Sequence, residues 1–192
     1  MKTPIFIIIV CFLISCQNKK TYNIILEQTT QDLILSDLKN NLIKIQKTEK
    51  GKVFFTLDPE CPLCKSYSKK MNEIHAEYSD SIDFYGFFPS TIFNKKKVDD
   101  FIKKNNIKME VIVDTNHILT NFLNASVTPE CFLLDSNLNI LYNGLIDDWI
   151  KELGRKRQNI DNNYLEDALS AYLKNKEILN KETKAIGCII EK

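Results

Sequence analysis

DPECPLCK, at residues 58–65, places two thiols three positions apart where the hydrophobic pattern of the chain changes. Directly before it, residues 53–57 (VFFTL) are rich in β-branched and aromatic side chains and have the length of a buried strand. Directly after it, apolar residues recur every three or four positions from Leu63 to Tyr78, which is the period of an amphipathic helix. The sequence therefore predicts that a strand ends and a helix begins at the two cysteines.

Pro62 sets the expected geometry of the two thiols. Proline suits the first helical position because the N–H it lacks has no partner there, so we expect Cys61 at the N-cap and Cys64 one turn inside the helix. The positive end of the helix dipole lowers the pKa of a neighbouring thiol. We therefore predict that Cys61 is an accessible, attacking thiolate and that Cys64 is a shielded, resolving thiol. Glu60 opposes thiolate formation and Lys65 favours it, and the sequence leaves their balance open.

A static disulfide and a metal site are the alternative interpretations of this pair. One CxxC motif supplies two ligands, so a metal site needs others. The best-placed outsider is His117, because the helix after strand 110–113 starts near the same sheet edge, and copper bound by Cys61, Cys64 and His117 is the metal alternative. A lone histidine is weak evidence for a ligand. We therefore expect His117 to be an exposed first-turn residue and predict no metal and no dissociable cofactor.

The first 15 residues have the pattern of a secretory signal, with Lys2 followed by an apolar run at residues 5–14. That run is too short to span a bilayer, which takes roughly 20 residues. Residues 13–16 (LISC) resemble the lipobox of bacterial lipoproteins, which implies cleavage before Cys16 and a lipid on that cysteine. The alternative is an ordinary cleaved signal. The prediction is a membrane-anchored, periplasm-facing lipoprotein of the bacterial cell envelope, with residues 16–21 as the lipidated cysteine and its tether.

Composition favours one globular domain over residues 22–192. The chain is 44% hydrophobic with a formal net charge of +1, which allows a sizeable core and predicts no nucleic-acid partner. The thiols left after processing are Cys61, Cys64, Cys131 and Cys188. In an oxidising compartment four thiols permit three pairings, and adjacency favours Cys61 with Cys64. Cys131 is expected to be a buried apolar residue, and the alternative is a position near the active thiols, since it should point to the same side of its strand as Pro129.

Further segments alternate between strand and helix patterns, and a strand, helix and strand in succession indicate a parallel crossover. Two short candidate strands, at residues 22–26 and 42–45, come first. The other predicted segments are a strand at 82–88, a helix around 98–102, a strand at 110–113, a helix at 118–123 capped by Asp114-Thr115, a hairpin of 130–134 with 140–142, and a helix at 165–173. The predicted fold is α/β, with a mixed central sheet flanked by helices, an N-terminal strand extension, a core at about 51–146 and a C-terminal helical extension at 147–192.

This order of elements, with Thr128-Pro129 opening a late strand, resembles the thioredoxin-like superfamily. There the proline is cis and faces the active thiols, which implies that Thr128 and Pro129 position the substrate. The chain more narrowly resembles redoxin-domain lipoproteins related to alkyl hydroperoxide reductase and thiol-specific antioxidant proteins. Four stretches carry this likeness: residues 59–64 with Tyr67, residues 127–130, residues 142–148, and residues 153–157 leading to 183–188.

The resemblance implies thiol–disulfide exchange with a protein or small-molecule disulfide or thiol. Cys61 would attack the substrate disulfide and Cys64 would resolve the mixed disulfide. A thiol peroxidase that uses Cys61 and a copper-binding chaperone similar to SCO proteins are the alternatives. The peroxidatic pattern of peroxiredoxins expects proline and threonine or serine where this chain has Phe54 and Asp58, which argues against peroxide as the main substrate.

Cys188 is the remaining candidate, as a third thiol. Some similar redoxins replace the second cysteine of the CxxC with serine and keep a cysteine in this C-terminal stretch, which implies that Cys188 resolves a disulfide formed at Cys61. Gly187 would let the backbone turn there. The alternative is a buried apolar chain end.

Overall fold

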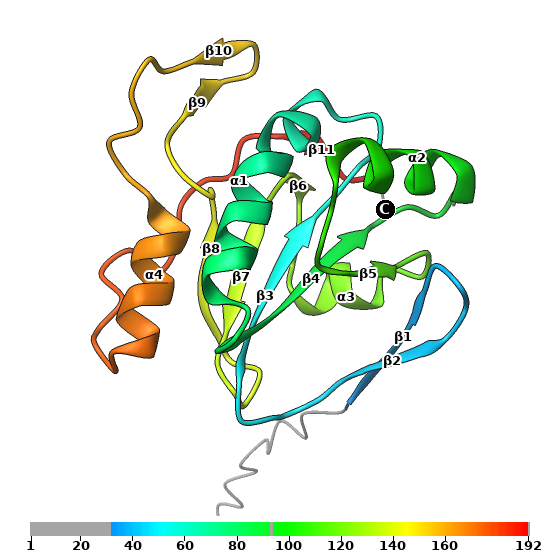
Figure 1. Ribbon diagram of the computed structural model, residues 1–192, viewed down its shortest axis with the longest axis horizontal. Coiled ribbons are helices and arrows are strands. Elements are labelled where there is room, and N and C mark those ends of the chain that lie inside the picture. The colour runs from blue at the N-terminus through cyan, green and yellow to red at the C-terminus, as the bar shows by residue number, and fades with distance from the viewer. Residues whose placement is uncertain (1–31, 93, 192) are drawn as a thin grey trace, which may run out of the picture.

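The computed structural model describes residues 32–92 and 94–191 of the 192-residue chain. These residues form a seven-stranded mixed sheet in the order β2-β1-β5-β4-β3-β7-β8, together with the two-stranded pairs β9–β10 and β6–β11 (Figure 1). The strands are β1 (Leu33–Asp37), β2 (Leu42–Ile45), β3 (Gly51–Thr56), β4 (Ile82–Phe88), β5 (Glu110–Val113), β6 (Val127–Thr128), β7 (Cys131–Leu134), β8 (Ile140–Gly144), β9 (Ile150–Glu152), β10 (Arg155–Lys156) and β11 (Cys188–Ile189). The helices are α1 (Pro62–Tyr78), α2 (Lys95–Asn105), α3 (Ile118–Phe122) and α4 (Tyr164–Leu173).

Strands β3, β4 and β5 are parallel to one another, and the other pairings in the sheet are antiparallel. The predicted parallel crossover and the predicted β7–β8 hairpin are therefore confirmed. Because parallel strands end at the same edge of a sheet, the loops after β3, β4 and β5 lie together there. The loop that carries Cys61 follows β3, so it lies at this edge.

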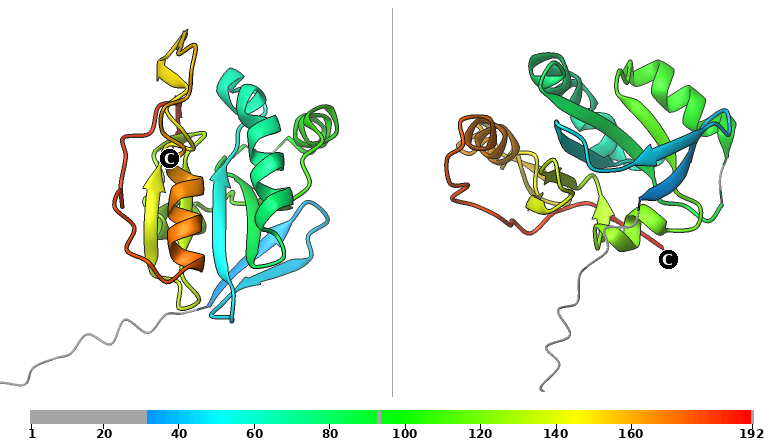
Figure 2. Two further views of the ribbon diagram at one scale, coloured as in Figure 1. Left: turned by 60° about the vertical axis from the view of Figure 1, so that its left-hand side comes forward. Right: turned by 90° about the horizontal axis from the view of Figure 1, so that it is seen from below.

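Helices cover both faces of the sheet. Figure 2 shows α1, α2 and α4 on one face and α3 on the other. Successive residues of β3 serve the two sides, since Val53 and Phe55 pack in the core beneath α1 and Phe54 packs in the core beneath α3. All three are fully buried, and each such side chain contributes about 1.5–3 kcal/mol relative to exposure. This packing on both faces holds the end of β3, and the cysteine loop after it, in place.

The N-terminal strand extension is a hairpin of β1 and β2, and β1 joins the sheet by pairing with β5. The predicted strand at 42–45 is confirmed as β2. The predicted strand at 22–26 lies outside the described residues. β1 was not predicted. Its turn is closed by Asp37, whose carboxylate accepts hydrogen bonds from the backbone N–H groups of Lys39 and Asn41.

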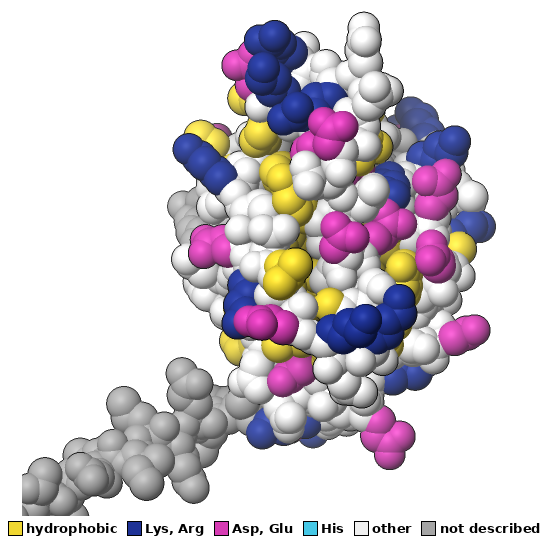
Figure 3. Space-filling view, turned by 90° about the vertical axis from the view of Figure 1, so that its left-hand side faces the viewer, with side chains coloured by type: hydrophobic (Ala, Val, Ile, Leu, Met, Phe, Trp, Pro, Cys, Tyr) yellow, Lys and Arg dark blue, Asp and Glu magenta, His cyan; other side chains and the backbone are white. Residues whose placement is uncertain are grey.

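The C-terminal extension contains the predicted helix, α4, and two features that were not predicted. The first is the β9–β10 hairpin, where basic side chains gather at the top of the face in Figure 3; Lys151, Arg155 and Lys156 are exposed there. The second is residues 181–191, which we call the C-terminal strap. They run along β8 and then cross to β6, at the N-terminal end of α1 (Figure 1).

Thr183 and Gly144 fasten the strap to β8. The backbone N–H of Thr183 donates to the carbonyl of Asn143, and the Thr183 hydroxyl accepts from the N–H of Leu145 at 2.8 Å. Gly144 has a φ of +132°, and a Cβ there would lie 2.2 Å from the Thr183 carbonyl oxygen. Glycine is therefore required for this close approach.

The start of α3 differs from the prediction. Its N-cap is His117, with a φ of 53°, and not Asp114-Thr115. The Asp114 carboxylate still satisfies the helix start, because it accepts from the N–H groups of Leu119 and Thr120. Within the described residues, no helix has the length and apolar character needed to cross a membrane.

Candidate active site

Cys61 lies at the N-cap of α1, and Pro62 occupies the first helical position, as predicted. The preceding loop is ordered by Asp58. Its backbone carbonyl accepts from the N–H of Cys61 at 3.2 Å, and its carboxylate accepts from the N–H of Glu60 at 2.8 Å. Among the described residues no side chain caps the helix by a hydrogen bond, and the Cys61 sulfur lies at its positive end.

The loop before β7 brings Thr128 and Pro129 to this sulfur. The Thr128–Pro129 peptide bond is cis, as the resemblance implied. The Cys61 thiol donates to the Thr128 carbonyl oxygen at 3.1 Å. Cys64 lies one turn into α1 and is completely buried, with its thiol directed at the Thr56 carbonyl. Cys61, Cys64 and Thr128 thus form one compact group at the carboxyl edge of β3.

Cys188 joins the same group from the other end of the chain. Strand β11 pairs antiparallel with β6, and this pairing places Cys188 opposite Thr128. The sulfur atoms of Cys188 and Cys61 lie 2.6 Å apart, and all four described cysteines are free thiols. The structure therefore brings together the three thiols that sequence reasoning had singled out.

The predicted accessibility of Cys61 is wrong. Cys61 is 1% exposed, and Cys188 is the one thiol of the three that is partly exposed. The physical reason is β11, which lies alongside β6 and fills the space above the helix N-terminus. A reagent therefore reaches Cys61 only when the strap moves.

The three thiols differ in acidity. Hydrogen bonding from Cys64 is the largest influence on the pKa of Cys61 and lowers it, against the effect of burial, and hydrogen bonding from Cys188 lowers it further. Burial, together with the neighbouring Cys61 sulfur, raises the pKa of Cys64 well above its usual range. The same two causes raise the pKa of Cys188. Cys61 is accordingly the thiol that ionises first, while Cys64 and Cys188 keep their protons and the Cys188 thiol donates to the Cys61 sulfur.

Glu60 and Lys65 act on Cys61 less directly than the sequence suggested. The Glu60 carboxylate forms an ion pair with Lys97 of α2 at 2.8 Å, and the hydrogen bond and charge of Lys97 lower the pKa of Glu60. Its charge is thereby partly offset by a cation that sequence reasoning did not consider. The Lys65 side chain is exposed to solvent.

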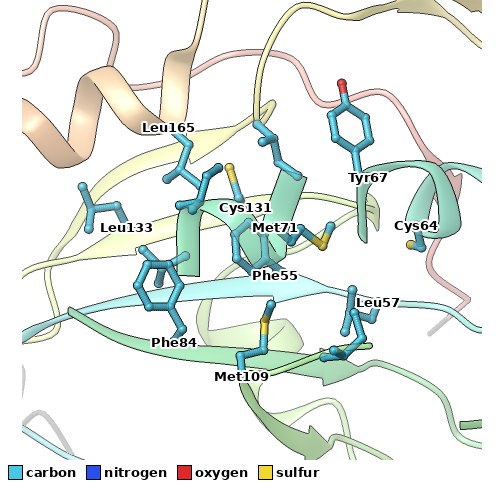
Figure 4. Packing of buried hydrophobic residues seen from close by; sticks show 14 of the residues in the cluster. Phe55, Leu57, Cys64, Tyr67, Met71, Phe84, Met109, Cys131, Leu133 and Leu165 are labelled. Atoms are coloured by element: carbon cyan, nitrogen blue, oxygen red, sulfur yellow. The ribbon is translucent and has the colours of Figure 1, made fainter. Parts of the chain in front are cut away.

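Cys131 is a buried apolar residue, as predicted, with its thiol 3.4 Å from the Gly144 carbonyl. Figure 4 shows it beside Leu165, apart from Cys64, with Met71 between the two in this view. Burial raises the pKa of Cys131 well above the usual range of a thiol. A protonated thiol without access to solvent is chemically inert.

His117 departs from its prediction as an exposed residue. It is 7% exposed, and within the described ranges neither ring nitrogen has a hydrogen-bond partner. The described part of the chain contains no group of three or more His, Cys, Asp or Glu side chains arranged to hold a metal ion. The structure therefore does not assemble the alternative ligand set of Cys61, Cys64 and His117.

Sequence reasoning missed two side chains that shape the loop beside Cys61. The Thr56 hydroxyl donates to the Val127 carbonyl at 2.7 Å and accepts from the N–H of Glu130 at 2.6 Å. The buried Glu130 carboxylate accepts from the N–H of Ser126 at 2.9 Å. The available signals were a hydroxyl at the end of an apolar strand and a carboxylate directly after the proline.

Comparisons with known proteins concern the family and the fold of the chain. The model of a family described as the AhpC/TSA family matches residues 26–143. No curated protein matches the chain. A hypothetical protein from Sinorhizobium meliloti superimposes with a TM-score of 0.72 at 20% identity, over 83% of this chain and 90% of that one.

Two further solved structures align over a smaller part of the chain. StoA from Bacillus subtilis has a TM-score of 0.53 at 20% identity, covering 60% of this chain and 87% of its own. The thioredoxin domain of a thiol-disulfide oxidoreductase from Bacteroides vulgatus has a TM-score of 0.52 at 14% identity, covering 60% and 84%. At these identities the likeness concerns the fold, and it confirms the predicted α/β, thioredoxin-like class.

Proposed function

Because this chain belongs to the AhpC/TSA family, we propose that it is a thiol–disulfide oxidoreductase that works through Cys61 and Cys64. One observation carries the proposal. The Cys61 sulfur lies at a helix N-terminus against the loop of a cis proline, with hydrogen bonds that lower its pKa, and Cys64 lies directly beneath it. This is the arrangement that an attacking thiolate and a resolving thiol need.

The reaction begins with attack of the Cys61 thiolate on one sulfur of a substrate disulfide. A bond forms between Cys61 and that sulfur, the substrate bond breaks, and the other substrate sulfur leaves as a thiolate that takes up a proton. The negative charge of the Cys61 thiolate is one of the causes that raise the pKa of Cys64. Formation of the mixed disulfide removes this charge, so Cys64 loses its proton more readily. Cys64 then loses its proton and attacks the Cys61 sulfur, the bond between Cys61 and the substrate breaks, and the second substrate sulfur leaves as a thiolate that takes up a proton. The substrate leaves fully reduced, and the protein keeps a Cys61–Cys64 disulfide that an external thiol must reduce.

The backbone at Val127 and Thr128 would hold a polypeptide substrate. This short strand, β6, offers an edge beside Cys61, and an extended segment can pair with such an edge through main-chain hydrogen bonds. In the described structure that edge is paired with β11. An incoming chain must therefore displace the strap.

The proposed site of action is the bacterial cell envelope, with the domain anchored to a membrane and facing the periplasm. Support comes from the sequence of residues 1–16, in which an apolar run precedes LISC and the cysteine at position 16. A lipid on Cys16 would tether the domain there. An oxidising compartment would supply the disulfides on which Cys61 acts.

Reduction of insulin disulfides by the full-length protein with a thiol donor tests the activity. Cys61→Ser should lower the rate at least about 100-fold, since the attacking atom is lost. The double variant Cys64→Ser, Cys188→Ser leaves Cys61 without a neighbouring thiol and should trap mixed disulfides with insulin. Cys131→Ala, in the core away from the site, should keep the wild-type rate. Peroxide consumption with the same donor is measured in parallel. Rapid loss of peroxide without insulin reduction would overturn the proposal in favour of a thiol peroxidase.

A further inference from the structure

The strap is held at the candidate active site by contacts on both sides of Cys188. Upstream, Thr183 is fastened to β8. Downstream, the N–H of Ile190 donates to the Ser126 carbonyl at 3.0 Å, and the Ile190 side chain is buried in the core beneath α3. The side chain of Ile189, which lies between Cys188 and Ile190 in the sequence, is 82% exposed. The strap is therefore held by contacts on both sides of Cys188, which place the Cys188 sulfur next to the Cys61 sulfur.

Gly187 allows the strap to come this close. A Cβ at this position would lie 2.3 Å from the carbonyl oxygen of Thr128 and 2.7 Å from its carbonyl carbon. Both are backbone atoms of the cis-proline loop, so they cannot move aside as a flexible side chain would. Any residue larger than glycine must push the strap away from Thr128, and with it the Cys188 sulfur away from Cys61.

The sulfur atoms are already close to bonding distance. They lie 2.6 Å apart, and a disulfide bond is about 2.05 Å long, so bonding needs a shift of roughly half an ångström. Cys61 also contacts Cys64, whose thiol is completely buried. Cys61 thus has an interior partner in Cys64 and a partly exposed partner in Cys188.

We infer that Cys188 is a third redox-active thiol of this site, which takes over the disulfide from the Cys61–Cys64 pair and carries it to the protein surface. This inference rests on the proposed function, because it requires a disulfide between Cys61 and Cys64. It adds a catalytic thiol that lies 127 positions after Cys61 in the sequence. In this proposal β11 pairs with the same edge of β6 that a substrate segment would use.

The exchange needs no outside oxidant. The Cys188 thiolate attacks the Cys61 sulfur, the Cys61–Cys188 bond forms, the Cys61–Cys64 bond breaks, and Cys64 leaves as a thiolate that takes the proton given up by Cys188. The number of disulfides stays the same. The bond has moved from two buried sulfurs to one that includes a partly exposed sulfur.

An external thiol can then reduce the protein without opening the strap. Its thiolate attacks the Cys188 sulfur, which is the accessible member of the new disulfide, and Cys61 is expelled. Cys61 is also the better leaving group of the two, since thiols of lower pKa leave faster. A second external thiol releases Cys188 as a free thiol, so two donor thiols become one disulfide and the protein becomes fully reduced.

The test uses full-length Cys64→Ser protein, oxidised with oxidised glutathione, quenched in acid, alkylated and mapped by mass spectrometry. We expect Cys61–Cys188 to be the main disulfide. Adding Gly187→Val should lower its yield at least about tenfold, because the second thiol loses the effective concentration that the strap provides. Ile189→Ala, which alters an exposed side chain of the same strand, is the matched control and should leave the yield unchanged. Ile190→Asp, which charges the buried anchor, should act like Gly187→Val.

Brief treatment of the Cys61–Cys188 form with reduced glutathione tests the exit route. The adduct should map to Cys188. An adduct at Cys61, a Cys64→Ser protein that carries only glutathione on Cys61, or an unchanged yield in Gly187→Val would each overturn the inference. Insulin reduction by the wild type separates the two proposals. Activity without any Cys61–Cys188 disulfide rejects the third thiol alone, and a Cys61–Cys188 disulfide in an inactive wild type rejects the proposed function.

Discussion

At the scale of single residues, the groups around Cys61 decide which thiol gives up its proton. The Thr128 carbonyl accepts from the Cys61 thiol, so it favours the protonated form, whereas donors from Cys64 and Cys188 favour the thiolate. The Thr128 hydroxyl is buried and makes no hydrogen bond within the described residues. It is therefore available to donate once Cys61 ionises.

This availability predicts the effect of Thr128→Val, which removes the hydroxyl and keeps the shape. The pKa of Cys61 should rise by roughly one pH unit, because a hydrogen bond to a charged group contributes about 1.5–3 kcal/mol and only part of it is lost here. Titration of the thiolate by its ultraviolet absorbance in reduced protein measures the pKa. Thr91→Val, at an exposed threonine, is the control. An unchanged pKa of Cys61 in Thr128→Val would show that the Thr128 hydroxyl does not stabilise the thiolate.

The lowered pKa of Cys61 also links the stability of the reduced protein to pH. In the unfolded chain this thiol ionises near its ordinary value of 9.0, so below that value and above the folded pKa the unfolded state binds more protons. The resulting stabilisation is present above the unfolded pKa and is lost as the pH falls through the folded pKa. Urea unfolding of reduced wild type and Cys61→Ser should therefore show a difference that grows with rising pH up to about 9. A difference independent of pH would contradict the shift.

At the scale of elements, two glycines decide where the strap can lie. Gly144 accepts the close approach of Thr183 on β8, and Gly187 accepts that of Thr128 on β6. Between these points the chain passes from one edge of the molecule to the candidate active site. The cover over Cys61 thus depends on contacts at both glycines, one of them well away from the sulfur atoms.

Gly144→Ala should consequently expose Cys61. The added Cβ would meet the Thr183 carbonyl at 2.2 Å and would also strain a φ of +132°. We expect faster alkylation of Cys61 in reduced protein, read by mass mapping of the labelled peptides. Gly154→Ala is the matched control, because its φ of +81° is also positive but no atom of the described residues lies within 4 Å of the added Cβ. Alkylation of Cys61 that is no faster in Gly144→Ala than in Gly154→Ala would contradict the release of the strap.

The elements that sequence reasoning predicted well are those with local signals. Residues 53–78 carry a strand pattern, a helix pattern and a proline between them, and the structure places β3, the N-cap Cys61 and α1 accordingly. The cis bond before Pro129 and the neighbourhood of Cys188 came from resemblance, since no local pattern links residue 188 to residue 61. The exposure of Cys61 could not be predicted, because its cover is a strand pairing between segments about 60 positions apart in the chain.

Two other misses have similar causes. His117 was expected in solvent, but its side chain is buried where α3 packs beneath the sheet, and that packing is a tertiary contact. β1 was overlooked because Ile34 is exposed, in a strand that pairs with β2 and β5 among the described residues. Neither position carries a short-range signal that separates these outcomes from the predicted ones.

At the scale of the whole molecule, the proposed lipid on Cys16 and the site at Cys61 belong to separate parts of the chain. The site is built from residues between 56 and 190, all within the described fold. Cys16→Ser should therefore move the protein from the membrane fraction to the soluble fraction of cells and leave insulin reduction by the purified protein unchanged. Fractionation with immunoblotting measures the first effect. A wild-type protein already in the soluble fraction would refute the lipid anchor.

The strap also bears on how long the protein survives oxidative damage. Thiolates with a lowered pKa are the ones most readily carried past the sulfenic stage to sulfinic and sulfonic acids, which ordinary thiols do not restore. Cys61 has the lowered pKa that invites this damage, but it is 1% exposed beneath β11. The rate at which oxidants damage the Cys61 thiol is therefore set by how often, and for how long, the strap moves away from Cys61. A partner that displaces the strap exposes Cys61 at the moment when a disulfide is present to react with it, and the same cover excludes small oxidants between encounters.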